Sequence, residues 1–476
     1  MLEIFFDLAL SRAAELDNYF KTHNKPVGPL HGVPISLKDQ FHVKGVETTM
    51  GYVGWIGTFQ GAKDHPNYRT FESELVRELQ SLGAVPFCKT SVPHTLMSGE
   101  SNNNIMGYVW NPKNRNLSAG GSSGGEGALI GARGSPLGFG TDIGGSVRIP
   151  SAFNGLYGLR PSSGRLPYQG MANSMDGQNT VLSVVGPLAT TARSLKFIMQ
   201  NVLSTQPWLH DPLVTELPWR VDQEQEMRTL TQPGNTLAFG LLEHDGIADL
   251  HPPVKRAIQT VARALQNHGH EVHRWAPPQP ASHNTVMAVG NKTWGYDGGA
   301  DVHSAFALSG EPPVKQIAAV YGTQPGQEVD ASYIHQTNRE KRDAQKAYMD
   351  YWNSTAALTS TGRPVDALIA PVAPFAAARP ETYHYVGYTM FVNVLDYTSV
   401  VVPVTTVDKN VDRKAEGYTP KDSLNEMLHG VYDPEVYDGA HVAVQIILRR
   451  FQEEKACVLA EYLSEVLEKE REVSKG

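Results

Sequence analysis

The stretch from residue 111 to residue 167 constrains this chain more than any other part, because its backbone is rich in glycine. Eleven of the 29 residues between Ser118 and Ser146 are glycine. Glycine tolerates positive φ and lets a backbone approach another group closely, and it costs conformational entropy elsewhere. The hydroxyls of Ser122, Ser123 and Ser146 lie among these glycines. We therefore expect a segment that presents nucleophiles and backbone N–H donors to a ligand.

Composition sets the class of protein. The chain has 476 residues, of which 41% are hydrophobic and 19% charged, so it can bury a large core. Its formal charge of −8 argues against a nucleic-acid partner, which would need a basic face. The two cysteines lie far apart in the sequence, which favours a reducing compartment, and we expect a cytoplasmic protein.

The first residues are apolar without forming a signal peptide. Glu3 and Asp7 stand where a signal peptide would need basic residues. Phe5, Leu8 and Leu16 recur at helical spacing and predict an amphipathic helix packed on the body of the protein. No run approaches the roughly 18 apolar residues that span a bilayer, so we expect no transmembrane segment.

The remaining patterns predict one large α/β domain, because strands and helices alternate without a repeat or a low-complexity linker. Stretch 208–233 shows no period and is expected to be a long connection. Apolar patterns predict strands at 33–37, 84–88, 237–242 and 271–275, and helices at 70–82, 252–268 and 451–472. Short apolar segments of unassigned type lie at 369–374, 400–404 and 442–448.

Two known loop motifs do not explain the glycine-rich stretch. A phosphate-binding loop needs a lysine after its glycines, and none follows near 120–127. The nucleophile elbow, Gly-x-Ser-x-Gly, matches twice around Ser122, but it requires a strand directly before the serine, and 111–120 is polar. We interpret that match as a by-product of glycine density.

Two other candidate centres also have a simpler interpretation. Cys88 lies in an apolar run with no histidine placed to activate it, so we expect a packed structural thiol. His268, His270 and His273 lie close together but lack the carboxylate or cysteine partners of a metal site. We expect no metal and no cofactor.

A serine–lysine pair would use the unusual features together. Lys38 ends a predicted strand, where a lysine is usually a solvated surface charge; the alternative is a buried lysine whose pKa falls until it acts as a base. If Ser146 attacks a carbonyl, such a lysine can take its proton through a second serine. Gly144 and Gly145, directly before Ser146, would let consecutive N–H groups point at the developing oxyanion.

The segment GGSSGGEGALIGARGSPLGFGTDIGGSVRIPSAFNGLYGLRPSSGRLP resembles the signature of the amidase signature family, and GPLHGVPISLKD resembles its lysine motif. The resemblance runs from about residue 27 to residue 191 and reappears in later segments such as VDALIAPVAP and FVNVLDYTSVVVPV. It is strongest to the fungal acetamidase-like group, which is related to fatty acid amide hydrolase. It implies the amidase signature fold, a single large α/β domain with a central twisted mixed sheet covered by helices on both faces. Within that domain we expect an N-terminal helix (1–23), a catalytic core with the lysine and Gly/Ser motifs (27–191) and a remainder that completes the sheet, the substrate channel and a C-terminal helix (192–476).

By position, the resemblance implies a role for each matching residue. Lys38 matches the catalytic lysine, Ser122 the bridging serine and Ser146 the nucleophile. The other implied residues are the oxyanion-hole donors Ile143, Gly144, Gly145 and Ser146, the supporting residues Ser123, Thr141, Asp142 and Arg148, and the acyl-pocket residues Leu96, Met97 and Ser98.

The implied activity is hydrolysis of a carboxylic amide to a carboxylate and ammonia or an amine, through an acyl-serine intermediate. Two alternatives stay open. The same triad could cleave a carbamate or an ester, since acyl-serine chemistry does not itself choose the leaving group. The chain could also be an amidase-like subunit of a glutamine-dependent amidotransferase. The expected partner is a small-molecule amide, and the resemblance leaves a homodimer open.

Overall fold

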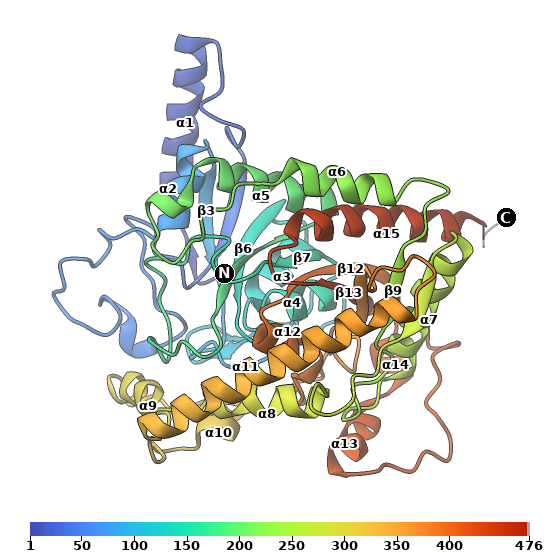
Figure 1. The fold of residues 1–476 in the computed structure, drawn as a ribbon. Helices are drawn as coiled ribbons and strands as arrows, with labels where there is room; N and C mark the ends of the chain where they lie inside the picture. Colours follow the sequence, from blue (N-terminus) through green and yellow to red (C-terminus); the bar gives the residue numbers. More distant parts are fainter. Residues whose placement is uncertain (474–476) are drawn as a thin grey trace.

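A single mixed sheet of eleven strands crosses the molecule (Figure 1). The computed structural model describes residues 1–473. The strand order is β1-β3-β2-β6-β8-β7-β12-β13-β11-β9-β10, and β4 and β5 form a separate pair. The strands are β1 (Glu3–Ile4), β2 (Pro34–Lys38), β3 (Val85–Thr90), β4 (Asn102–Asn103), β5 (Gly107–Tyr108), β6 (Leu137–Asp142), β7 (Tyr157–Arg160), β8 (Val184–Ala189), β9 (Ala238–Leu241), β10 (Glu271–Arg274), β11 (Ala367–Pro371), β12 (Thr398–Thr406) and β13 (His441–Leu448).

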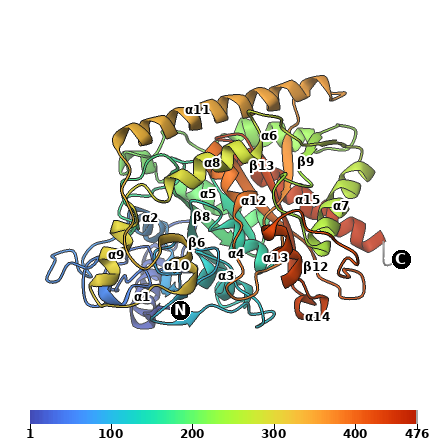
Figure 2. The same ribbon diagram turned by 90° about the horizontal axis from the view of Figure 1, so that it is seen from below.

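Helices cover both faces of this sheet. In Figure 1, α5, α6 and α15 lie above it and α8, α11 and α12 below it; Figure 2 shows the lower group from beneath. The helices are α1 (Phe6–His23), α2 (Glu74–Ser81), α3 (Gly124–Gly131), α4 (Arg148–Phe153), α5 (Ala192–Ser204), α6 (Val221–Leu230), α7 (Pro252–Asn267), α8 (His283–Thr293), α9 (Ala300–Ala307), α10 (Lys315–Tyr321), α11 (Ala331–Ser354), α12 (Gly387–Leu395), α13 (Ser423–Val431), α14 (Pro434–Tyr437) and α15 (Glu453–Val473), with 3-10 turns at Val53–Trp55, Pro207–Leu209 and Thr355–Ala357.

Parallel pairing at one end of the sheet positions the site. Strand β2 runs parallel to both β3 and β6. The carboxyl ends of parallel strands meet at the same sheet edge. Lys38, the last residue of β2, and Asp142, the last residue of β6, therefore lie at one edge. The predicted α/β class and single large domain are confirmed.

The prediction for residues 208–233 was wrong, because helix α6 lies within them. Its apolar positions are few, and polar contacts hold it in place. Glu224 accepts hydrogen bonds from Trp219 Nε1 (2.9 Å) and Lys196 Nζ (2.9 Å), and Arg228 bridges to Glu461 on α15 (3.0 Å). A periodicity test on apolar residues cannot detect a helix of this kind.

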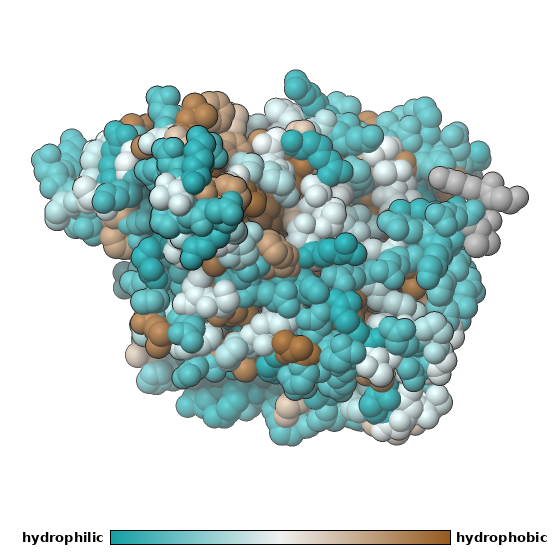
Figure 3. Space-filling view, turned by 90° about the horizontal axis from the view of Figure 1, so that it is seen from above, coloured by the Kyte–Doolittle hydropathy of each residue, from teal (hydrophilic) through white to brown (hydrophobic). Residues whose placement is uncertain are grey.

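Helix α1 is present but begins at Phe6 rather than at residue 1, because Glu3–Ile4 pair with β3 as strand β1. Its apolar face is only partly covered. Leu16 is buried, whereas Leu8 is 47% exposed. Figure 1 shows α1 projecting from the body, and Figure 3, which views the molecule from above, shows hydrophobic residues on the left of an otherwise largely hydrophilic face. Within residues 1–473, no helix has the length and apolarity needed to cross a membrane.

The cysteines and the clustered histidines have ordinary packing roles. Cys88 and Cys457 are both free and buried, and burial raises the pKa of the Cys88 thiol. His270 contacts the hydroxyl of Tyr462 at 2.6 Å. His273 lies 2.8 Å from Glu271. Among the residues that the structure describes, no group of three or more His, Cys, Asp or Glu side chains could hold a metal ion.

Candidate active site

Lys38 lies in a fully buried polar pocket at the end of β2, so the surface interpretation of this lysine was wrong. Its Nζ donates to Oγ of Ser122 (2.7 Å) and to Oγ1 of Thr141 (2.7 Å). Desolvation lowers the pKa of Lys38 to about 7, against the opposing charges of Asp142 and Glu126. A large fraction of Lys38 is therefore neutral near pH 7 and able to accept a proton.

The glycine-rich loop places Ser122 and Ser123 at the start of α3. The peptide bond between Gly121 and Ser122 is cis. The N–H of Ser123 donates to the carbonyl oxygen of Ser146 (3.3 Å), so the two serine segments lie against each other. Ser123 Oγ donates to the carbonyl of Thr141 (3.5 Å). A Cβ on Gly121 would lie 2.6 Å from the carbonyl oxygen of Ser98, which explains the glycine there.

The loop that carries Ser146 folds around the carboxylate of Asp142. This carboxylate accepts the N–H groups of Gly145 (2.9 Å) and Val147 (3.2 Å) and pairs with the guanidinium of Arg148 (3.0 Å). Burial alone would raise the pKa of Asp142, but the charge and hydrogen bonds of Arg148 hold it well below its usual range. Asp142 and Arg148 are both fully buried, which fixes the backbone on either side of Ser146.

Arg148 also forms hydrogen bonds with residues on helix α12 and strand β13. Its guanidinium donates to the carbonyl of Thr389 (3.0 Å), to Asn393 Oδ1 (2.6 Å) and to Gln445 Oε1 (3.0 Å). Thr389 also donates to the carbonyl oxygen of Gly144 (2.6 Å). Helix α12 and strand β13 thus hold the Ser146 loop, although they follow it by more than 200 residues.

Three of the four N–H groups expected at an oxyanion hole are free. Those of Ile143, Gly144 and Ser146 have no hydrogen-bond acceptor within residues 1–473. The N–H of Gly145 already donates to Asp142, so Gly145 shapes the loop in this structure. Its φ is +128°, and a Cβ there would lie 2.4 Å from Thr389 Oγ1. Gly144 is open, since a Cβ there would meet Val386 only at 3.6 Å.

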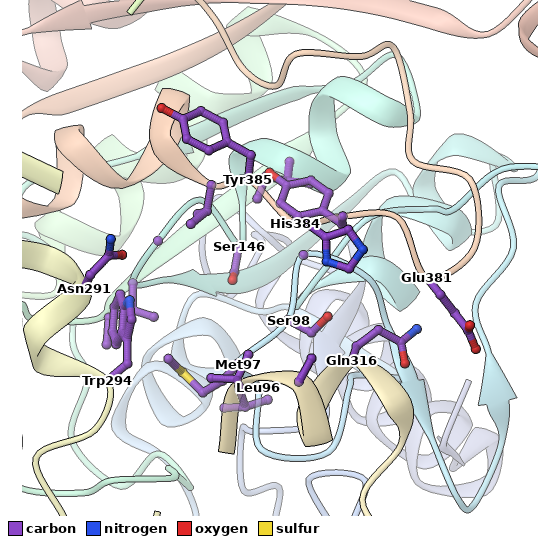
Figure 4. Close-up of a pocket in the computed structure, with 18 of the residues that line it drawn as sticks. Leu96, Met97, Ser98, Ser146, Asn291, Trp294, Gln316, Glu381, His384 and Tyr385 are labelled. Atoms are coloured by element: carbon purple, nitrogen blue, oxygen red, sulfur yellow. The ribbon is translucent and has the colours of Figure 1, made fainter. Parts of the chain in front are cut away.

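Ser146 opens into a cavity of about 390 Å³. In Figure 4, Ser146 lies between Asn291 and Trp294 on one side and His384 and Gln316 on the other. The structure brings all three expected pocket residues to this cavity, which is lined by Leu96, Met97, Ser98, Gly99, Ile143, Gly144, Ser146, Ile149, Asn291, Trp294, Lys315, Gln316, Ala319, Val320, Glu381, Tyr383, His384, Tyr385 and Val386.

Several of these cavity residues lie outside the sequence motifs. Trp294 lines the cavity, whereas the nearby Tyr296 turns away and donates to Thr180 Oγ1 (3.2 Å). Gln316 on α10 and Val386 before α12 reach the cavity from segments without a motif. Only tertiary packing places them there.

Sequence reasoning also missed two polar residues around Lys38. Gln40 Oε1 accepts a hydrogen bond from Thr141 (2.8 Å) and so orients a partner of Lys38. Glu126 on α3 is fully buried and accepts hydrogen bonds from Ser36 (2.6 Å) and Thr90 (2.8 Å). Burial raises the pKa of Glu126 to about 7. A glutamate in the first turn of a glycine-rich helix could have been noticed, but its proximity to Lys38 could not.

Comparison with known proteins gives consistent matches over nearly the whole chain. A family model described as Amidase matches residues 1–457. An acetamidase of Aspergillus oryzae is 46% identical over 465 residues, which cover 98% of this chain and 82% of the relative. An acetamidase of Emericella nidulans is 44% identical, with coverage of 98% and 82%.

A solved structure agrees with the sequence matches. Fatty acid amide hydrolase superposes with a TM-score of 0.87 at 31% sequence identity. The superposition covers 98% of this chain and 78% of that one. The similarity therefore includes the central sheet and the helices on both of its faces.

Proposed function

Because this chain belongs to the amidase signature family and is an amide hydrolase, we propose that it cleaves a carboxylic amide through an acyl-enzyme on Ser146. Ser146 is the nucleophile, Ser122 the proton relay and Lys38 the base. The products are a carboxylate and ammonia or an amine. The acetamidase relatives support a small neutral amide as the substrate.

The proton path follows the hydrogen bonds of Lys38. The neutral amine of Lys38 takes the proton of Ser122, and Ser122 takes that of Ser146 as its Oγ bonds to the carbonyl carbon. The N–H groups of Ile143, Gly144 and Ser146 bind the oxyanion. The proton then returns along the same path to the leaving nitrogen as the C–N bond breaks. Water repeats the sequence on the acyl-Ser146 ester and releases the acid.

One observation carries this proposal: the buried amine of Lys38 lies 2.7 Å from Ser122 Oγ and contacts hydroxyls only. A buried lysine beside a carboxylate would stay charged and could not act as a base. Within residues 1–473, Lys38 has no carboxylate at ion-pair distance, since its contacts are to Ser122 and Thr141.

Trapping the acyl-enzyme tests the proposal. We expect rapid quenching with an amide substrate, followed by peptide mass spectrometry, to place the acyl mass on Ser146. Matched amide, carbamate and ester substrates with one acyl group then identify the preferred leaving group. Label on another residue would contradict the proposal. Activity only with added protein subunits and glutamine would favour the amidotransferase alternative.

The pH dependence of kcat/KM follows from Lys38. Only the neutral amine accepts a proton, so activity rises with pH, and we expect a half-maximal value near pH 7. Below that pH the rate falls about tenfold per unit. Glu126, whose pKa is also about 7, titrates over the same pH range, and its charge acts on Lys38. A profile that decreases from pH 6 to pH 8 would contradict this assignment.

A pair of variants tests which group sets the acidic limb of the profile, that is, the rise of kcat/KM with pH. The negative charge of Glu126 raises the pKa of Lys38, so Glu126→Gln should move the limb to lower pH. Glu78→Gln is the matched control, because Glu78 is a buried carboxyl on α2 whose pKa burial raises to about 8. Its charge does not act on Lys38, so its profile should match that of the unmodified enzyme. Equal profiles for both variants would exclude Glu126.

A further inference from the structure

Gln40 lies two residues beyond Lys38 and contacts a hydrogen-bond partner of that lysine. It is 1% exposed. Thr141 Oγ1 donates to Gln40 Oε1 (2.8 Å), and Lys38 Nζ donates to Thr141 Oγ1 (2.7 Å). The backbone of Gln40 is held on both sides, because its N–H donates to the carbonyl of Lys38 (2.6 Å) and its carbonyl accepts the N–H of Ala172 (3.0 Å). The carboxamide of Gln40 therefore reaches Thr141 from a fixed backbone.

Two neighbours determine which end of the Gln40 carboxamide faces Thr141. Its Nε2 donates to Tyr168 Oη (3.0 Å) and to Asn173 Oδ1 (2.9 Å). Tyr168 Oη donates to the same Oδ1 (2.7 Å), and Asn173 Nδ2 donates to the carbonyl of Met171 (3.5 Å). Asn173 is thus oriented with its oxygen toward Gln40. Since the nitrogen of Gln40 faces these acceptors, its oxygen must face Thr141.

The oxygen of Gln40 fixes the direction of the Thr141 hydroxyl. A threonine hydroxyl has one hydrogen to donate and accepts through its lone pairs. That hydrogen points to Gln40, so Thr141 can only accept a hydrogen bond from Lys38, which uses one N–H there. A neutral amine has a single lone pair. The lone pair of Lys38 then stays available for the proton of Ser122, whose Oγ lies 2.7 Å from Nζ.

We propose that Gln40 is a positioning residue of the reaction, which acts through Thr141 to direct the lone pair of neutral Lys38 toward Ser122. The inference rests on the proposed function, since it concerns the base of that mechanism. Without the oxygen of Gln40, the hydroxyl of Thr141 would lack its acceptor, and buried hydroxyls are nearly always paired. The lone pair of Lys38 is an acceptor that Thr141 already contacts. Thr141 would then compete with Ser122 for that lone pair.

Gln40→Met tests this, because it removes the carboxamide and keeps an unbranched side chain of similar length. We expect the plateau of kcat/KM at high pH to fall about tenfold, a part of what a general base contributes. The acidic limb should also move to lower pH, because a hydrogen bond from Thr141 to the lone pair stabilises the neutral form of Lys38. The titratable groups around this network are the same in both enzymes: Asp142, Glu126, Tyr168 and the ion pair of Asp39 with Lys89.

A double-mutant cycle tests whether Gln40 acts through Thr141. Thr141→Val leaves no hydroxyl to redirect, so Gln40→Met should change the plateau by less than about twofold in that background. Gln178→Met is the matched control, because the carboxamide of Gln178 exchanges two hydrogen bonds of 2.8 Å with the backbone of Val181. This control should keep both the plateau and the acidic limb of the unmodified enzyme.

The position of the acidic limb does not depend on how much of a preparation is folded, so the test holds even if Gln40→Met is less stable. A limb that stays in place overturns the inference, whatever the plateau does. An equal loss of activity from Gln40→Met in the unmodified and Thr141→Val backgrounds also overturns it. In either case acyl transfer to Ser146 would still support the proposed function, whereas acyl transfer to another residue would overturn both. The two failures are thus distinguishable.

Discussion

Ser146→Ala should lower kcat for amide hydrolysis on the order of 10³-fold or more while leaving the fold intact. The substitution removes the oxygen that forms the acyl-enzyme. The carbonyl oxygen of Ser146 accepts the N–H of Ser123, and alanine keeps this backbone contact. Residue Ser146 is 8% exposed, and within residues 1–473 its Oγ forms no hydrogen bond that the core depends on. Steady-state kinetics and thermal unfolding of the same preparation measure the two expectations.

Ser151→Ala provides the matched control. Ser151 is a buried serine on α4, five residues beyond Ser146, and its Oγ donates to the carbonyl of Val147 (2.8 Å). It is not among the residues that line the cavity. We expect its kcat to change by less than about threefold, with a stability loss of about 1 kcal/mol for one hydrogen bond. Appreciable turnover by a folded Ser146→Ala enzyme would exclude Ser146 as the nucleophile.

The fold was largely accessible from the sequence, because its strands are short apolar runs. The runs at 33–37, 237–242 and 442–448 correspond to β2, β9 and β13. Their order in the sheet was not predictable, since β13 pairs with both β11 and β12, and those pairs depend on contacts between distant segments. Helix α6 was not predicted because charged contacts, rather than an apolar stripe, hold it in place.

The residues of the candidate site could be predicted from the sequence only through motifs. Their burial, charges and hydrogen-bond directions could not be predicted. On strand position alone, Lys38 would be a surface charge. In the structure it is buried, and its hydrogen-bond partners Ser122 and Thr141 follow it by 84 and 103 residues. The loop spacing suggested N–H donors at Gly144 and Gly145. The orientation of the Gly145 N–H toward Asp142 depends on a carboxylate held by Arg148, and a spacing cannot encode that direction.

Two buried lysines lie near the carboxyl ends of the neighbouring strands β2 and β3, and their partners give them different roles. Lys38 and Lys89 are both fully buried, and in the β2–β3 register Lys89 pairs with the residue just before Lys38. Lys89 forms an ion pair with Asp39 (2.6 Å), whereas Lys38 contacts two hydroxyls. Burial lowers the pKa of both lysines, and the charge of Asp39 opposes that shift at Lys89. Lys89 is therefore the structural cation, and Lys38 the candidate base.

Lys38→Met should therefore lose activity and keep its stability, whereas Lys89→Met should lose stability and keep its kcat. We expect Lys38→Met to lower kcat by about 10²–10⁴-fold, the usual contribution of a general base. Its free energy of unfolding should change by only about 1 kcal/mol, since the lost hydrogen bonds are offset by removal of a desolvated amine. Lys89→Met leaves the carboxylate of Asp39 buried without its cation, which costs about 3–5 kcal/mol.

The fraction of Lys89→Met that remains folded should keep a kcat close to that of the unmodified enzyme, because Lys89 does not line the cavity. Denaturant unfolding and active-site titration of each variant separate stability from turnover. If Lys38→Met keeps activity near that of the unmodified enzyme, Lys38 is not the base. A stable Lys89→Met enzyme without activity would identify Lys89, and not Lys38, as the base. Both substitutions replace a buried amine with the same apolar side chain, so any difference between the variants reports on the partners of each lysine. A carboxylate keeps the amine of Lys89 charged and structural, whereas two hydroxyls leave the amine of Lys38 free to accept a proton.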